Sequence, residues 1–180
     1  VVIAEKADLW WSKDPVHDRL CKQRFADALV AARGGELDEW ADSARARLAL
    51  IILLDQISRS LHRDSAEAFA GDDRARSLAA GGIERRQDRD LRYCERVFFY
   101  LPFMHSENLN DQEQSVGLYR GLLAAAPSSL EEQFSGNLDY AIAHRDLIQR
   151  FGCFPHRNAV LGRESSAEEL AYLAEPAAGF

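Results

Sequence analysis

The stretch ARARLALIILLDQISRSL, residues 44–61, decides the fold. Its centre, Leu48–Leu54, is apolar on every side, whereas a helix at a protein surface keeps one polar face. The stretch therefore predicts a central helix that other elements cover all round. A buried strand is the competing interpretation, but the arginine-containing start and the polar Asp55-Gln56 continuation favour a helix.

Helical patterns continue on both sides of this stretch, and clean strand alternation is hard to find. Asp14 followed by Pro15 predicts a helix start, because a side-chain cap precedes a residue whose missing N–H is harmless in the first turn. That helix should run to Gly34-Gly35. Further helices are predicted within residues 64–82, 90–103 with a break or kink at Pro102, 110–126, 130–152 with Gly152 as its cap, and 166–174 with Ser165 and Glu168 as its cap.

About seven helices with short connections and no strands predict an all-α protein. No linker or low-complexity tract divides the sequence, so we expect a single domain over residues 1–180. Ala75, Ala79 and Ile83 form a smooth stripe at four-residue spacing. Such stripes suggest stacked antiparallel helical hairpins, as in an α-solenoid, and a compact irregular bundle is the alternative.

Composition and charge exclude several classes of function. Of 180 residues, 47% are hydrophobic and 28% charged, as in an ordinary soluble globular protein, and the net charge of -7 argues against bulk nucleic-acid binding. The three cysteines are far apart and form no CxxC pair, which fits a reducing cytoplasm. No apolar run approaches the roughly 20 residues of a membrane span, and we expect no signal peptide.

Four polar clusters interrupt the apolar helices and form the candidate site. They are Asp55, Gln56 and Arg59; His105, Ser106 and Glu107; His144 and Arg145; and Pro155, His156, Arg157 and Asn158, with Arg163 shortly after. Buried charge is costly unless it is paired and hydrogen-bonded, so clusters of both signs should meet each other. We expect Asp55 and Glu107 to face these arginines, and residues 101–107 to pack on residues 154–158 with both close to Asp55-Gln56.

Three blocks of the sequence resemble a known family. LLDQISRS (53–60), FFYLPFMHSENLNDQEQSV (98–116) and AHRDLIQRFGCFPHRNAVLGRESSAEELAYL (143–173) are similar to the hallmark sequences of the bacterial family catalogued as domain of unknown function 924. The resemblance covers nearly the whole chain, from Trp10-Trp11 onward. It implies an all-helical fold similar to tetratricopeptide repeats (TPR) and no assigned role. It also marks Gln112 and the residues of the four clusters, except Arg145, as characteristic positions.

The chain departs from the family pattern at two positions. Ser60 stands where the family often has asparagine, and Cys153 stands where arginine is usual. The second difference would remove one cation from a pocket.

The interpretation that we favour is recognition of a small anionic molecule or a peptide carboxylate in a polar groove. Arg59 and Arg157 would clamp the carboxylate, with Gln56 and Asn158 as neutral partners. The complete predicted ligand-binding set is Asp55, Gln56, Arg59, His105, Glu107, His144, His156, Arg157, Asn158 and Arg163.

Two other interpretations stay open. In an enzyme, His105 or His156 would be the general acid or base, oriented by Glu107 or Asp55. In a structural or protein-binding domain, the same cluster would be an internal lock that satisfies buried donors and acceptors. Convergence of His105, His156 and Arg157 on a solvent-connected cavity would favour a site, whereas saturation by internal bonds with no cavity would favour a lock.

We predict neither a metal nor a cofactor. The side chains that could supply nitrogen and oxygen ligands are His105, Glu107, His144 and His156, but no HxxxH or HExxH spacing is present. The sequence also has no P-loop, GxGxxG or EF-hand spacing. Ser106 lacks a glycine-flanked elbow and suits a helix cap better than a nucleophile. Cationic neighbours of Cys153 would lower the pKa of its thiol.

Overall fold

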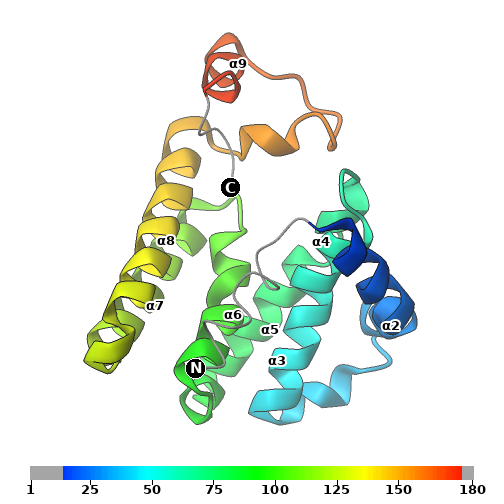
Figure 1. The fold of residues 1–180 in the computed structure, drawn as a ribbon, viewed down its shortest axis with the longest axis vertical. Helices are drawn as coiled ribbons and strands as arrows, with labels where there is room; N and C mark the ends of the chain where they lie inside the picture. The colour runs from blue at the N-terminus through cyan, green and yellow to red at the C-terminus, as the bar shows by residue number, and fades with distance from the viewer. Residues whose placement is uncertain (1–13, 176–180) are drawn as a thin grey trace. The chain divides into compact units, whose positions relative to one another are not determined.

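The computed structural model describes residues 14–175, and this range is helical throughout, with no strand (Figure 1). The α-helices are α2 (Pro15–Gly34), α3 (Ala44–Ile52), α4 (Ser58–Leu61), α5 (Asp72–Glu84), α6 (Tyr93–Met104), α7 (Leu109–Ala125), α8 (Glu131–Phe151) and α9 (Ala167–Leu173). A π-helical turn, Leu53–Ile57, joins α3 to α4, and short 3-10 turns occupy Asp38–Asp42, Ala66–Phe69, Gln87–Asp90, Ser128–Leu130 and Pro155–Arg157. The all-α prediction is confirmed for the described residues.

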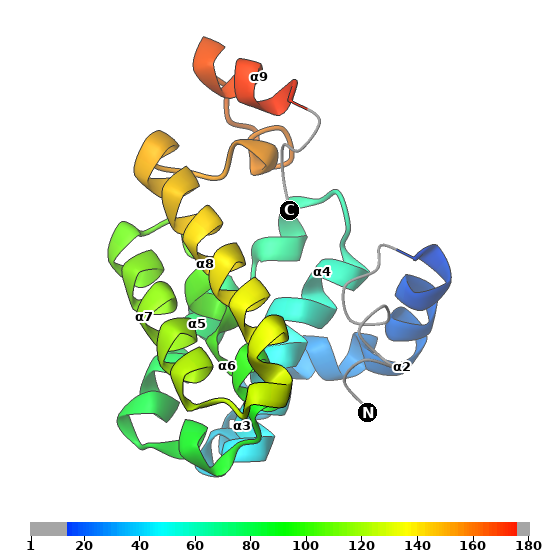
Figure 2. The ribbon, with the colours of Figure 1, turned by 60° about the vertical axis from the view of Figure 1, so that its left-hand side comes forward.

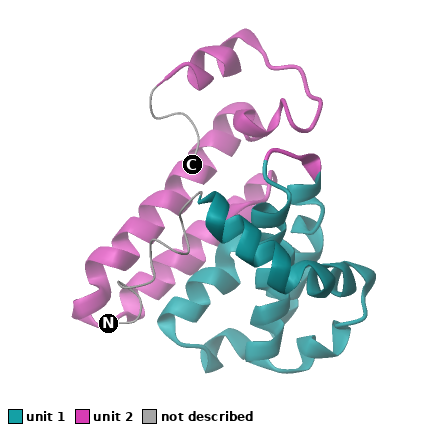
Figure 3. Cartoon of the chain, turned by 45° about the vertical axis from the view of Figure 1, so that its right-hand side comes forward, with its two compact units in different colours: residues 1–63, 67–102 teal, residues 64–66, 103–180 magenta. Residues whose placement is uncertain are grey.

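The chain divides into two compact units, which Figure 3 colours separately. Unit 1 comprises Val1–Arg63 and Glu67–Pro102, and unit 2 comprises Asp64–Ala66 and Phe103–Phe180. The boundary falls in the last turn of α6, because Pro102 lies inside that helix, which continues to Met104. Each unit is described by itself, and the single domain over residues 1–180 stays a prediction.

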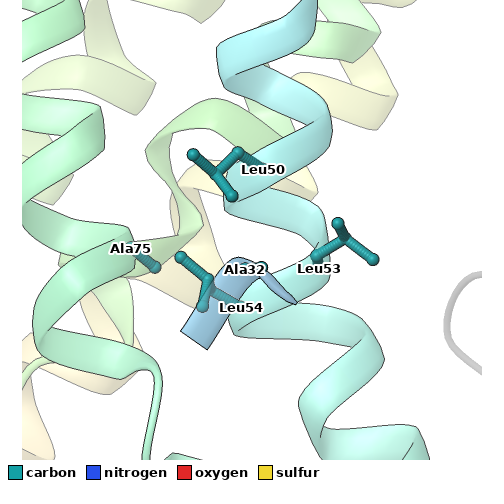
Figure 4. Packing of buried hydrophobic residues seen from close by; sticks show 5 residues of the cluster. All are labelled: Ala32, Leu50, Leu53, Leu54 and Ala75. Atoms are coloured by element: carbon teal, nitrogen blue, oxygen red, sulfur yellow. The ribbon is translucent and has the colours of Figure 1, made fainter. Parts of the chain in front are cut away.

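The apolar run of residues 48–54 forms the core of unit 1. Leu50, Leu53 and Leu54 pack with Ala32 of α2 and Ala75 of α5 (Figure 4). All five are buried. The small side chains at the two alanine positions let α2 and α5 come close to the leucines. The predicted central helix is therefore confirmed, and the alternative of a buried strand is wrong.

Local sequence signals set several helix ends. The Asp14 side chain accepts a hydrogen bond from the N–H of Val16 at the start of α2, and Gly35 ends that helix in the left-handed conformation. Gly152 ends α8 in the same way, with φ 72°. The cap of α9 lies one residue later than predicted, because Ser166 and Glu169, not Ser165 and Glu168, form the capping box. None of the described helices is long and apolar enough to cross a bilayer.

In unit 2, α7 and α8 form a hairpin and lie side by side in both ribbon views (Figures 1 and 2). The segment that follows α8 leads to α9 and closes a small core of Leu147, Ile148 and Phe154. Phe151 and Tyr172 add a ring pair to this core, with centroids 5.4 Å apart. This packing holds the segment 153–165, which carries four of the ten predicted ligand-binding residues, against the end of α8.

Candidate functional site

Glu107 joins the segment after α6 to the segment after α8. Its Oε1 accepts a hydrogen bond from the backbone N–H of Phe154 at 2.8 Å. Arg163 donates to both carboxylate oxygens, at 2.6 and 2.9 Å. Nearby, Nη1 of Arg157 donates to the carbonyl oxygen of His105 at 3.1 Å. The prediction that residues 101–107 and 154–158 pack together is therefore confirmed.

The electrostatics of Glu107 are those of a structural anion. Burial disfavours its charged form, but hydrogen bonds from Arg163 and the N–H of Phe154, with the charges of Arg163 and Arg157, outweigh that effect. The pKa of Glu107 therefore lies below its usual value, and its hydrogen bonds raise the pKa of Arg163. The pair stays ionised at neutral pH and locks the two segments together.

Gln112 of α7 holds the segment after α6 from inside unit 2. Its side chain is 0% exposed, and its Nε2 donates to the carbonyls of Met104, at 2.7 Å, and Ser106, at 2.6 Å. These carbonyls lie at and just after the end of α6, where no further helical N–H groups are available to bind them. Because the bonded carbonyls flank His105, Gln112 positions that residue. The family resemblance pointed to Gln112, but no local pattern indicated this role.

Asn158 ties the segment after α8 to α9. It is buried, and its Nδ2 donates to Oγ of Ser165 at 3.0 Å and to Oε1 of Glu169 at 3.3 Å. Glu169 also accepts from the thiol of Cys153 at 3.0 Å and from the N–H of Ser166 at 2.7 Å. Together these donors lower the pKa of Glu169 to about 2, and the hydrogen bond from the thiol has the largest effect. Asn158 is thus one member of a second lock.

The two candidate nucleophiles have structural partners. Burial, followed by the hydrogen bond to Glu169, raises the pKa of Cys153 to about 11. The charge of Arg163 lowers this pKa, as predicted for a cationic neighbour, but it is outweighed, so the expected net lowering is wrong. Ser106 donates its hydroxyl to Asp111 at 2.6 Å. The cap of α7 is Asn108, whose side chain accepts from the first turn of the helix, so the predicted cap role of Ser106 is also wrong.

Two histidines and an arginine contact the ring of Phe154, and a third histidine lies beside one of these histidines. The centroid of the Phe154 ring lies 5.5 Å from that of His144, 5.6 Å from that of His156 and 4.5 Å from Cζ of Arg157. The ring of His105 lies 6.4 Å from that of His144. Phe154, His144 and Arg157 are buried, whereas His156 is exposed. We call these five residues the histidine cluster.

His144 is held in one orientation at the centre of the histidine cluster. Its Nδ1 lies 2.8 Å from the carbonyl oxygen of Tyr140, and because a carbonyl only accepts, this nitrogen carries the proton. Burial is the main reason that the pKa of His144 falls to about 3. Repulsion by His105, Arg157 and His156 lowers it further, while the bond to Tyr140 opposes the shift. The imidazole is therefore neutral at pH 7 and sits in a positive field.

In unit 1, Asp55 and Arg59 form the predicted ion pair. Asp55 is 1% exposed within the π-helical turn, and its Oδ1 lies 3.2 Å from Nη1 of Arg59. Arg59 also donates to both oxygens of Asp72, at 2.8 and 2.9 Å, and Gln56 donates to Asp55 at 2.5 Å. Sequence reasoning missed Asp72, which starts α5. The predicted approach of Asp55-Gln56 to residues 101–107 and 154–158 stays a prediction.

Arg145 pairs with two carboxylates that were not predicted. It pairs with Glu113 at 3.2 Å and with the adjacent Asp146 at 2.6 Å, and both carboxylates are exposed. Within residues 14–175, no group of three or more histidine, cysteine or acidic side chains is arranged to hold a metal ion.

Comparison with known families shows to which family the chain belongs. A family model described as "Bacterial protein of unknown function (DUF924)" matches residues 2–177. The chain belongs to the DUF924 family. This DUF924 chain is similar to a solved structure described as "Structure of Protein of Unknown Function ATU0120 from Agrobacterium tumefaciens". The two are 40% identical with a TM-score of 0.84, over 94% of this chain and 92% of that chain. A comparison with curated proteins finds no match.

Proposed function

We propose that this DUF924 protein recognises a small anionic molecule or a peptide carboxylate at the histidine cluster of unit 2. One observation carries the proposal: His144, His156 and Arg157 contact the single ring of Phe154, and the ring of His105 lies beside that of His144. The guanidinium of Arg157 and the N–H groups of His105 and His156 can donate hydrogen bonds to carboxylate or phosphate oxygens, whereas the N–H of neutral His144 is already donated to the carbonyl of Tyr140.

The electrostatics of His144 support an anionic ligand. The neighbouring groups that move its pKa by charge are His105, Arg157 and His156, and each of them disfavours a further positive charge. An anion placed among these groups would lower their mutual repulsion, because opposite charges within about 4–6 Å stabilise each other. The exposed ring of His156 gives such an anion a route from solvent.

The other predicted ligand-binding residues take a supporting role in this proposal. Glu107 and Arg163 bind each other, and Asn158 binds Ser165 and Glu169. These bonds hold the segment that carries His156 and Arg157. Binding sites need such rigid support, because a ligand otherwise has to order the loop itself.

For unit 1 we propose a separate supporting role. The predicted set there is Asp55, Gln56 and Arg59, and Arg59 is bonded to Asp72 as well as to Asp55. The four side chains connect the π-helical turn to the start of α5. A direct contact between Arg59 and a ligand would require this network to open.

An acid–base enzyme is the second candidate, and one observation favours it. His144 has a defined tautomer, with Nδ1 protonated and Nε2 carrying the lone pair. A pKa of about 3 makes this imidazole a weak base at neutral pH. Both oxygens of Glu107 are engaged by Arg163 and the N–H of Phe154. Recognition therefore fits the geometry better than general base catalysis.

A histidine-resolved NMR titration tests the recognition proposal. The protein is titrated with inorganic phosphate and then with acetate, at constant pH and with chloride balancing the ionic strength. We expect saturable shifts of the imidazole signals of His105, His144 and His156. The signals of His17 and His62 in unit 1 serve as internal controls and should stay still. Equal shifts at all five histidines, or none, would contradict an anion site at the histidine cluster.

Variants at His156 complete this test. His156 is exposed, so His156→Gln should keep the fold while weakening phosphate binding. His62→Gln is the matched control and should bind phosphate as the wild type does. Full phosphate affinity in His156→Gln would remove this residue from the site.

Two broader predictions also remain proposals. We propose that the helices stack as TPR-like antiparallel hairpins, and the α7–α8 hairpin supports this arrangement. Small-angle scattering should then give a radius of gyration above the roughly 16 Å expected for a compact chain of this length. We also propose a cytoplasmic location, which the three free cysteines, Cys21, Cys94 and Cys153, support.

A further inference from the structure

We infer that the preferred ligand of the histidine cluster is an aryl carboxylate, in which the anionic group is attached to an aromatic ring, and that Tyr140 contacts this ring. The inference rests on the proposed anion site and adds the chemical class of the ligand. It is carried by the position of Tyr140 and by the continuous series of rings that leads from it into the histidine cluster.

Tyr140 lies one helical turn before His144 on α8, so both side chains are on the same face. Their ring centroids are 6.3 Å apart, and their planes are inclined by 37°. The carbonyl oxygen of Tyr140 also accepts the Nδ1 proton of His144, which keeps the imidazole beside this turn of the helix. Tyr140 is nevertheless 58% exposed, which leaves much of its side chain in contact with solvent.

The rings continue from Tyr140 toward the other side of the histidine cluster. Centroid distances are 6.3 Å from Tyr140 to His144, 5.5 Å from His144 to Phe154 and 5.6 Å from Phe154 to His156. The two inner rings are buried, and the two outer rings are exposed. All three separations lie within the range of aromatic contacts, so a series of aromatic rings leads from solvent to the guanidinium of Arg157.

A ligand with an aromatic ring and a carboxylate matches both parts of this arrangement. The carboxylate would meet the imidazoles of His105 and His156 and the guanidinium of Arg157, and the ring would lie against the exposed ring of Tyr140. Tyrosine is well suited to such contacts because its large, rigid ring gives contact area at a low cost in conformational entropy. An aliphatic acid gains the charge interaction but not the contact between rings.

Three monocarboxylates separate charge, apolar area and aromaticity. Benzoate, cyclohexanecarboxylate and acetate are titrated into the full chain, and affinities are measured from the His144 and Tyr140 NMR signals. We expect benzoate to bind roughly 2- to 10-fold more tightly than cyclohexanecarboxylate, the factor that an aromatic pair of ordinary strength supplies. Acetate should bind most weakly but still at the same histidines.

Variants then assign the preference to one ring. Tyr140→Phe keeps the ring and should keep the preference for benzoate. Tyr140→Leu should bring the benzoate-to-cyclohexanecarboxylate ratio to about 1 and leave phosphate binding unchanged. Phe25→Leu is the matched control, because Phe25 is an exposed aromatic residue on α2 of unit 1, and it should keep the wild-type ratio.

The outcomes distinguish the two proposals. If none of the carboxylates nor phosphate binds at the histidines, both the anion site and the aryl preference are wrong. If acetate and phosphate bind but benzoate has no advantage over cyclohexanecarboxylate, only the aryl preference is overturned. If the advantage persists in Tyr140→Leu, the contact with Tyr140 is overturned.

Discussion

At the scale of single residues, the buried and half-buried charged side chains around the histidine cluster each have several partners. Arg157 lies over the ring of Phe154 and donates to the carbonyl of His105, while Glu107 receives Arg163 and a backbone N–H. A buried charge that loses a partner leaves the other group desolvated, so truncation costs more than the bond itself contributed. The stability of the segment 153–165 therefore depends on pairs of residues.

Arg157→Ala should lower the free energy of unfolding by about 2–3 kcal/mol. The variant loses one hydrogen bond from a charged donor and a cation–π contact. Arg157→Lys keeps the charge but not the planar group, so its free energy of unfolding should lie between those of Arg157→Ala and the wild type. Chemical denaturation measures all three proteins. A stability equal to or above the wild type would show that Arg157 does not stabilise the fold.

Glu107→Gln should cost about 1.5–3 kcal/mol, because both charge-assisted bonds from Arg163 weaken together. Glu113→Gln is the matched control. Glu113 is exposed and pairs with Arg145 at the surface, so its replacement should change stability by about 0–1 kcal/mol. Thermal melts of the two variants under identical conditions make the comparison. Equal melting temperatures would rule out the Glu107 lock.

At the scale of elements, the central helix contains a feature that its hydrophobic pattern did not predict. The π-helical turn at Leu53–Ile57 lies between α3 and α4 and carries the buried Asp55. Such turns are rare in helices, and they change which side chains face the interior. The neighbouring helix α5 approaches this region closely: a Cβ at Gly71 would lie 2.5 Å from the carbonyl oxygen of Leu54.

A pair of adjacent glycines in α5 tests this close packing. A Cβ at Gly82 would lie 2.5 Å from Cζ of Phe99 and 2.7 Å from Cδ of Arg47, so Gly82→Ala should cost about 1–3 kcal/mol. A Cβ at Gly81 has its nearest neighbour at 3.5 Å, so Gly81→Ala should be neutral or stabilising by roughly 0.5–1 kcal/mol. Denaturant titrations give the free energy of unfolding of both variants. Similar changes in the two would contradict the close packing around Gly82.

At the scale of the whole molecule, two kinds of group make stability depend on pH. The pKa of His144 is about 3 in the folded protein, far below the ordinary value of 6.5 for histidine. Its stabilising effect is complete above pH 6.5 and is lost as the pH falls, because the unfolded chain then binds a proton that the folded chain does not. The pKa of Glu107 is also lowered, so its contribution is lost at more acidic pH.

Between pH 6.5 and about 4.5, the free energy of unfolding should therefore fall by up to about 1.4 kcal/mol for each pH unit through His144 alone. His144→Gln removes the titrating group and should flatten this part of the curve. His62→Gln should keep the wild-type slope. Urea denaturation at half-unit pH intervals provides the measurement, and an unchanged slope in His144→Gln would contradict a buried, neutral imidazole.

Much of the fold could be predicted because helix formation depends on neighbouring residues. Apolar spacing indicated the central helix, Asp14-Pro15 marked the start of α2, and Gly152 marked the end of α8. These signals act within one or two turns, where backbone conformation and capping bonds are settled. The one-residue error at the cap of α9 arose because two serines, Ser165 and Ser166, precede two glutamates and both spacings satisfy the same local rule.

The sequence by itself therefore determined that this protein is helical, where most helices lie and which polar residues are candidates for a site. Only the tertiary structure decided their partners: Arg163 binds Glu107, which is 56 positions away, and Arg59 binds Asp72. It also made Phe154 the centre of the histidine cluster and placed Tyr140 beside His144. The reason is physical, since hydrogen bonds and ring contacts depend on distances of a few ångströms that packing sets, whereas periodicity reports only which face of a helix is buried.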